Sequence, residues 1–234
     1  MTIHKLLGKL FLLGTVSLAA QKALPPEVEI TAEPHHRMIF QNDYVRAFDA
    51  TVVPKDATLM HYHRHDYVYV AIGASTISNE VKGKAPVQVA LADGETRFSD
   101  GGFAHIARDV GITTFHAIAV ELLQDEKMRN APSRWDSEPA IQAQGGAEEV
   151  LFVKDGVRVS RVELQTAGFE ARHHHAGPHL VIAVTDLTLR AEAPDKTPTN
   201  IDLKAGEVKW VNGNITHTVT NVGSQPAKLV SLEF

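Results

Sequence analysis

The chain has 234 residues and a formal net charge of −5, with no basic stripe, so its composition argues against a nucleic-acid-binding protein. It has no cysteine, which excludes disulfides, thiolate nucleophiles and cysteine-ligated zinc. Any metal ion must therefore be held by histidine nitrogens or by oxygen atoms, and histidine is abundant, with 13 residues.

Residues 1–20 have the pattern of a secretory signal peptide. A short charged start with Lys5 precedes an apolar run over 10–16 and a series of small residues. The pattern predicts export to the periplasm or the cell exterior, since the apolar run is too short for a transmembrane helix. Lys9 supports the alternative, an amphipathic arm that stays attached to a cytoplasmic protein. We expect residues 21–37 to form an extended linker.

The chain contains an internal repeat with an offset of 112 residues, the difference between positions 173 and 61. The pairs related by this offset are His61 and His173, His63 and His175, His105 and His217, Gly94 and Gly206, Gly111 and Gly223, and Glu121 and Glu233. No gap is needed between these anchors, which indicates a tandem duplication. We expect one unit over residues 38–122, a second over 150–234, and a linker over 123–149, where Pro and Gly recur.

Each unit is a series of short β-type runs, such as 68–72, 87–91 and 117–120, separated by Gly, Pro, Asn and Asp. Short apolar or alternating runs at this spacing are typical of a β-sandwich or barrel. The sequence therefore predicts an all-β chain with two tandem barrels.

Two histidine pairs indicate metal sites inside these barrels. Residues 180–184 form an apolar, β-branched run, and on a strand alternate side chains point to the same face, so His173 and His175 share a face. Imidazoles on one face, joined by others from elsewhere, are typical of a metal site. A run of three histidines alone is more often a solvated loop, but here the His-x-His arrangement occurs twice, at His61 and His63 as well.

At these residues the chain resembles the cupin superfamily, and two copies resemble a bicupin of the dioxygenase (quercetinase-like) type. The first cupin motif is G-x5-H-x-H-x3,4-E-x6-G, and its histidine pair is present in both units. Its glutamate position holds Tyr67 in the first unit and His179 in the second. The second motif, G-x5-P-x-G-x2-H-x3-N, fits both units in spacing, at Gly94, Gly102, His105 and Asp109, and at Gly206, His217 and Asn221. The resemblance covers nearly everything after residue 26.

The resemblance implies two tandem jelly-roll barrels, each with a metal site formed where the second-motif histidine meets the histidine pair. The implied sites are His173, His175, His179 and His217 in the second unit, and His61, His63 and His105, with Tyr67 nearby, in the first. Neutral imidazoles suit a divalent transition metal, which could be Fe, Mn, Ni, Cu or Zn. An alternative for the first unit is a decayed copy in which the histidines only form hydrogen bonds.

The missing glutamate puts the catalytic groups in question, because in cupin dioxygenases it is commonly a ligand and sometimes the base. His179 could replace it as a ligand and could also accept a proton. Tyr67 is a poorer ligand, since its phenol must lose a proton, and it could equally be a strand residue with its hydroxyl in solvent. His65 could compete with His61. We expect His36 at the surface, and the sequence does not place Glu170.

Three functions remain open. The first is a metal-dependent oxidoreductase, similar to a dioxygenase, that acts on a small anionic or enolic substrate. The second is a non-redox metal-dependent lyase, isomerase or cyclase, which fits a carboxylate-free site slightly better because the metal keeps its full charge. The third is a metal-dependent binding or storage protein without turnover. A homodimer formed through barrel edges is compatible with the resemblance, but no specific interface is evident.

Overall fold

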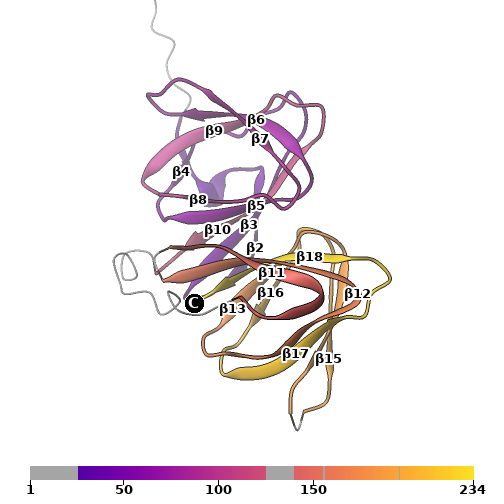
Figure 1. Cartoon of the computed structure of the whole chain (residues 1–234). Helices are drawn as coiled ribbons and strands as arrows, with labels where there is room; N and C mark the ends of the chain where they lie inside the picture. Colours follow the sequence, from indigo (N-terminus) through magenta and orange to yellow (C-terminus); the bar gives the residue numbers. More distant parts are fainter. Residues whose placement is uncertain (1–25, 125–139, 155, 195) are drawn as a thin grey trace, which may run out of the picture.

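The computed structural model describes residues 26–124, 140–154, 156–194 and 196–234, which form two β-barrels (Figure 1). The described chain is almost entirely β-strand, with a single 3-10 turn, η1 (Ile30–Ala32), so the predicted all-β fold class is confirmed. The predicted signal peptide, residues 1–20, lies outside the described residues. Within the described ranges, no helix has the length and apolar character needed to span a membrane.

The N-terminal barrel is made of two five-stranded sheets that face each other. The first has the order β1 (Val28–Glu29), β4 (His61–His63), β9 (Phe103–Asp109), β6 (Ser75–Val81) and β7 (Val87–Leu91). The second has the order β2 (His36–Gln41), β3 (Val45–Val52), β10 (Phe115–Leu122), β5 (Tyr67–Ala71) and β8 (Thr96–Ser99). The stretch that we expected as an N-terminal linker contains β1, which pairs in parallel with β4.

The C-terminal barrel is a single eight-stranded sheet that curls on itself. Its strand order is β15 (Thr199–Leu203), β14 (Leu187–Glu192), β17 (Ile215–Asn221), β12 (Val157–His175), β18 (Ala227–Glu233), β13 (His179–Ala183) and β16 (Val208–Val211), with β11 (Ala143–Lys154) paired to β12. The long strand β12 contacts three neighbours, because its two ends pair with different strands. The C-terminal end of β12, which pairs with β17, carries His173 and His175.

The two barrels share one hydrophobic core, which lies where β3, β5 and β10 face β12, β13 and β18 (Figure 1). Residues of both halves pack in it fully buried, including Val45, Val68, Ile118, Leu180, Ile182 and Leu232. Burying each such side chain contributes about 1.5–3 kcal/mol. Beside this core, Phe40 and Tyr44 of the first half pack against Trp210 and Phe234 of the second.

Strand register brings the histidines of the two motifs together. His61 on β4 lies opposite His105 on β9, and His173 on β12 lies opposite His217 on β17. In the loop before each second-motif strand, a glycine allows the backbone to approach the backbone that follows the histidine pair. A Cβ at Gly101 would lie 2.4 Å from the carbonyl carbon of His65, and the same close approach occurs at Gly213.

Candidate metal centres

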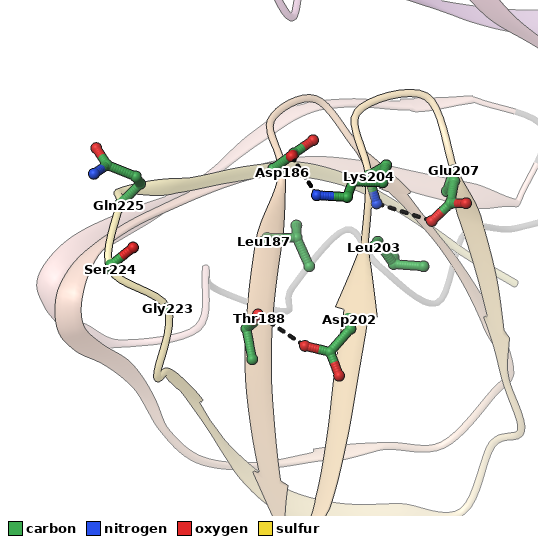
Figure 2. Close-up of a pocket in the computed structure, with 10 residues that line it drawn as sticks. All are labelled: Asp186, Leu187, Thr188, Asp202, Leu203, Lys204, Glu207, Gly223, Ser224 and Gln225. Atoms are coloured by element: carbon green, nitrogen blue, oxygen red, sulfur yellow. Dashed lines mark hydrogen bonds and ion pairs between the residues drawn. The ribbon is translucent and has the colours of Figure 1, made fainter.

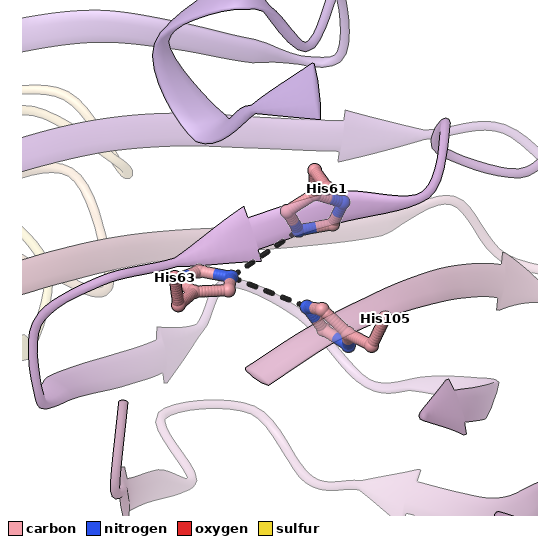
Figure 3. A group of neighbouring side chains, drawn as sticks. All are labelled: His61, His63 and His105. Atoms are coloured by element: carbon pink, nitrogen blue, oxygen red, sulfur yellow. Dashed lines mark hydrogen bonds between the residues drawn. The ribbon is translucent and has the colours of Figure 1, made fainter. Parts of the chain in front are cut away.

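The N-terminal centre is formed by His61, His63 and His105, whose side chains converge from β4 and β9 (Figure 3). The Nε2 atoms of His61 and His63 are 3.2 Å apart, as are those of His63 and His105. All three residues are at most 9% exposed. His65, which could compete for this position, lies beyond the end of β4 and outside the group.

The C-terminal centre is formed in the same way by His173, His175 and His217. The Nε2 atom of His173 is 2.9 Å from that of His175 and 3.0 Å from that of His217. His174, between the two β12 histidines, is exposed and contacts Thr216 on the outside of the sheet. The alternation along β12 therefore sorts one histidine to solvent and two to the interior.

Hydrogen bonds to the opposite ring nitrogens fix the tautomers in these centres. Nδ1 of His61 donates to the carbonyl of Leu59, and Nδ1 of His173 donates to the carbonyl of Ala171. The Nε2 atoms of His61 and His173 then carry lone pairs, which can accept a hydrogen bond from a neighbouring imidazole or bind a metal ion. Metal–nitrogen bonds of about 2.0–2.1 Å at tetrahedral or octahedral angles place ligand nitrogens roughly 2.9–3.4 Å apart. Both triads fit a divalent transition metal.

Burial lowers the pKa of five of these imidazoles, those of His61, His63, His105, His173 and His217, and so favours the neutral form that binds metal. Desolvation, followed by the charge of His36, lowers the pKa of His61 to about 4. Desolvation and the neighbouring histidines lower the pKa of His217 to about 3 and the pKa values of His63 and His105 well below their usual range. Protons therefore compete with a metal ion only in acid.

The residues at the cupin glutamate position stack on the second histidine of each pair. Tyr67 is parallel to His63, with ring centroids 4.1 Å apart and an interplanar angle of 13°. His179 lies over His175 at 4.2 Å and 32°. Tyr67 is buried, so the alternative of a solvent-facing hydroxyl is wrong, and burial raises the pKa of its phenol. His179 does not group with His173 and His217, but with His175 and Glu233.

A cluster of carboxylates surrounds His175 inside the C-terminal barrel. Glu233 accepts a hydrogen bond from Nδ1 of His175, and the buried Arg158 lies 3.7 Å from Glu233 and 3.3 Å from Glu148. Glu170, which the sequence did not place, lines the same cavity. Its burial, with the negative charges of Glu148 and Glu233, raises the pKa of Glu170 to about 8. Glu170 is therefore a neutral carboxylic acid at pH 7.

A buried carboxylate also supports the N-terminal centre. Glu33 accepts hydrogen bonds from Nδ1 of His36 at 2.7 Å, Nδ1 of His35 at 3.0 Å and the amide of Leu59 at 3.0 Å. The ring of His36 lies 4.6 Å from that of His61, and its side chain is only 6% exposed. Our expectation of a surface position for His36 is therefore wrong: the segment before β2 folds inward because Glu33 needs these donors.

The interior cavities differ from a hollow on the outer surface. The C-terminal cavity has a volume of about 330 Å³ and the N-terminal one about 60 Å³. The surface hollow lies beside β14 and β15 (Figure 2). Its polar groups are bonded to one another, Lys204 to Asp186 and Thr188 to Asp202.

No family model and no curated protein matches this chain. Solved structures do match it. A variant of oxalate decarboxylase OxdC from Bacillus subtilis superposes with a TM-score of 0.59 at 11% identity, covering 82% of this chain and 69% of that one. AerE from Microcystis aeruginosa superposes with a TM-score of 0.56 at 10% identity, covering 86% of this chain and 97% of that one.

The chain has a bicupin fold. The predicted resemblance is confirmed at the level of fold, which is as far as identities near 10% reach. Each barrel of this bicupin brings together the histidines of both motifs, and these could hold a divalent metal ion. The residues that sequence reasoning missed, Glu148, Glu170 and His36, lie outside both motifs, and no spacing signal marks them.

Proposed function

We propose that this bicupin is a metal-dependent enzyme that acts on a small organic anion in its C-terminal barrel, by a non-redox lyase or isomerase reaction. A divalent transition metal held by His173, His175 and His217 would supply Lewis-acid polarisation of a bound substrate oxygen. The N-terminal triad would hold a second metal ion, in a cavity of about 60 Å³.

The observation that carries the proposal is the neutral Glu170 in the same cavity as the histidine triad. When a C–C bond breaks without oxidation, the electron pair left on the substrate must be protonated; when a C–H bond breaks, a base must also accept the departing proton, and the neutral imidazole of His179 in the same cavity would do so. Glu170 would donate this proton and regain one from solvent. The positive charge of a nearby metal ion favours the carboxylate, so it would move the pKa of Glu170 down from about 8 toward neutrality, where a general acid works best.

The charges around the cavity support an anionic substrate. Glu148 and Glu233 flank Arg158, His175 donates to Glu233, and Glu170 is neutral. A divalent metal would therefore leave the site with a net positive charge of about one, which a monoanion would neutralise. His179, whose pKa burial lowers to about 3, is neutral and would accept or donate a hydrogen bond to the substrate.

Proton exchange tests this proposal directly. The metal-loaded full chain is incubated in D₂O under argon with a panel of small carboxylic and 2-oxo acids, and deuterium incorporation is followed by NMR. We expect exchange by the wild type, a loss of about a hundredfold in Glu170→Gln, and no loss in Glu163→Gln, because Glu163 is half exposed on the barrel surface. Equal rates in the two variants would overturn the role of Glu170.

A second candidate is a dioxygenase-like oxidoreductase. It is favoured by triads of neutral imidazoles without a carboxylate, which suit Fe, Ni, Cu or Mn. Oxygen uptake that requires both the metal and an organic substrate would choose it over the lyase. A protein that carries only zinc and takes up no oxygen would exclude it. A binding role without turnover is less favoured, because the C-terminal cavity is open and contains an acid.

A further inference from the structure

The cavities of the two barrels are the same cavity built twice. Twelve of the thirteen residues that line the N-terminal cavity have a counterpart, 112 positions later, that lines the C-terminal one. His36 corresponds to Glu148, Ala50 to Val162, Ile77 to Leu189 and Val89 to Ile201. The thirteenth, Phe115, corresponds to Ala227 in the apolar core of the second barrel. A difference in volume therefore comes in part from the side chains at shared positions, and in part from ten residues, Glu170 and Glu233 among them, that line only the C-terminal cavity.

Three exchanges open the C-terminal cavity. Tyr67, Tyr69 and Phe115 of the first barrel are replaced by His179, Val181 and Ala227 in the second. Four positions change in the opposite sense, from Ala50 to Val162, Val89 to Ile201, Ala107 to Val219 and Ala117 to Leu229, but they add aliphatic rather than ring volume. The net result is about 330 Å³ in place of about 60 Å³.

The gained space is apolar on one side and polar on the other. Val181, Leu189, Val219 and Leu229 belong to one packed apolar cluster, and Trp210, whose ring packs on Phe40 and Phe234 between the two halves, also lies at the cavity wall. The polar lining includes His175 with its hydrogen-bonded partner Glu233, together with Glu148 and Glu170. Such a cavity distinguishes a head group from a hydrocarbon body.

We infer that the C-terminal cavity takes an organic monoanion with an apolar body at least as large as a phenyl ring, of the arylalkanoate class. The inference rests on the proposed function for its head group, which would lie at the histidine triad. A dry apolar cavity of about 150 Å³ accepts benzene, so 330 Å³ holds a ring with a short side chain, and 60 Å³ does not. A short dianion such as oxalate would leave the apolar wall empty and would meet Glu148 and Glu233.

Binding can be measured without turnover, through Trp210. The chain has two tryptophans, so Trp135→Phe leaves Trp210 as the reporter. With the zinc-loaded full chain, we expect 3-phenylpropionate to bind at least about thirtyfold more tightly than acetate, because the ring leaves water for the apolar wall. Oxalate should bind no better than acetate. Equal affinity for acetate and phenylpropionate, or a preference for oxalate, would overturn the inference.

Variants that import first-barrel residues provide the structural test. Val181→Tyr and Ala227→Phe should each weaken phenylpropionate binding at least about tenfold and leave acetate binding and zinc content unchanged. Tyr69→Val, the reverse exchange in the first barrel, is the matched control and should leave phenylpropionate binding unchanged. If both narrowing variants retain zinc and bind phenylpropionate as the wild type does, the size argument is wrong. If either fails to fold, the other and the wild-type probe series decide.

The two proposals fail differently. Tight phenylpropionate binding without proton exchange on any substrate would support the ligand class proposed for the cavity and contradict the proposed enzymatic function. Proton exchange on a two-carbon acid, with no preference for an apolar body, would support the proposed enzymatic function and contradict the arylalkanoate ligand class.

Discussion

Glu233 accepts a hydrogen bond from Nδ1 of His175, while Nε2 of the same ring faces the C-terminal histidine triad. The corresponding histidine of the first barrel, His63, differs. Its Nδ1 has no hydrogen-bond partner among the described residues. A carboxylate behind a ligating imidazole orients the ring and raises its basicity. The two triads thus have similar distances between Nε2 atoms, but only the C-terminal triad has a carboxylate hydrogen-bonded to the second histidine of the pair.

Glu233→Gln should therefore weaken metal binding at the C-terminal centre by about 10- to 100-fold, because the amide orients His175 less strongly and removes a negative charge. Competition with a chromophoric chelator measures the change. Glu163→Gln serves as the control, since Glu163 is half exposed and lies on the outer surface of β12. If the glutamine variant of Glu233 binds metal as tightly as the wild type, the hydrogen bond does not tune this centre.

Two independent centres predict separable metal stoichiometry. We expect two metal ions per chain after reconstitution, and one after either His63→Ala or His175→Ala, because each substitution removes a ligand from one triad. His174→Ala is the matched control, as this ring lies on the opposite face of β12 and contacts Thr216. Elemental analysis after desalting gives the count. Loss of both ions from a single substitution would contradict independence.

The raised pKa of Glu170 makes stability depend on pH. Its pKa is about 8 in the folded protein against a usual 4.5, so the folded state binds more protons between these values and stability falls as pH rises. A tenfold change in an acid dissociation constant corresponds to about 1.4 kcal/mol. Between pH 4.5 and 8, the free energy of unfolding of the metal-free wild type should therefore fall by about 3–5 kcal/mol relative to that of Glu170→Gln. Urea denaturation at several pH values measures this. A pH-independent difference would contradict the raised pKa.

The repeat explains how much of the site could be predicted. The shared offset predicted two β-units, and the resemblance to cupins implied that His61 meets His105 and that His173 meets His217, which is where the strand register places them. Glu170 could not be placed, because its counterpart is Thr58 and the offset carries no information about it. Its position depends on a register shift in β12 between Glu170 and His173, which no local pattern announces.

The sequence did not predict the inward fold of the segment before β2, because that fold depends on the buried hydrogen bonds of Glu33. Burial alone would raise the pKa of Glu33, but hydrogen bonds from His36, His35 and Leu59 outweigh it and lower the pKa to about 2. Because the unfolded state, with a pKa near 4.5, binds more protons between these values, the stabilisation is present above pH 4.5 and lost toward pH 2.

Glu33→Gln should therefore cost about 3 kcal/mol of stability at pH 7, and the difference from wild type should shrink as the pH falls from 4.5 toward 2. Chemical denaturation across this range measures both effects. Glu29→Gln is the matched control four residues away: its pair with Arg64 is exposed to solvent, so its loss should change the stability little. A loss in the Glu29 variant equal to that in the Glu33 variant would show that the buried hydrogen bonds do not stabilise this segment.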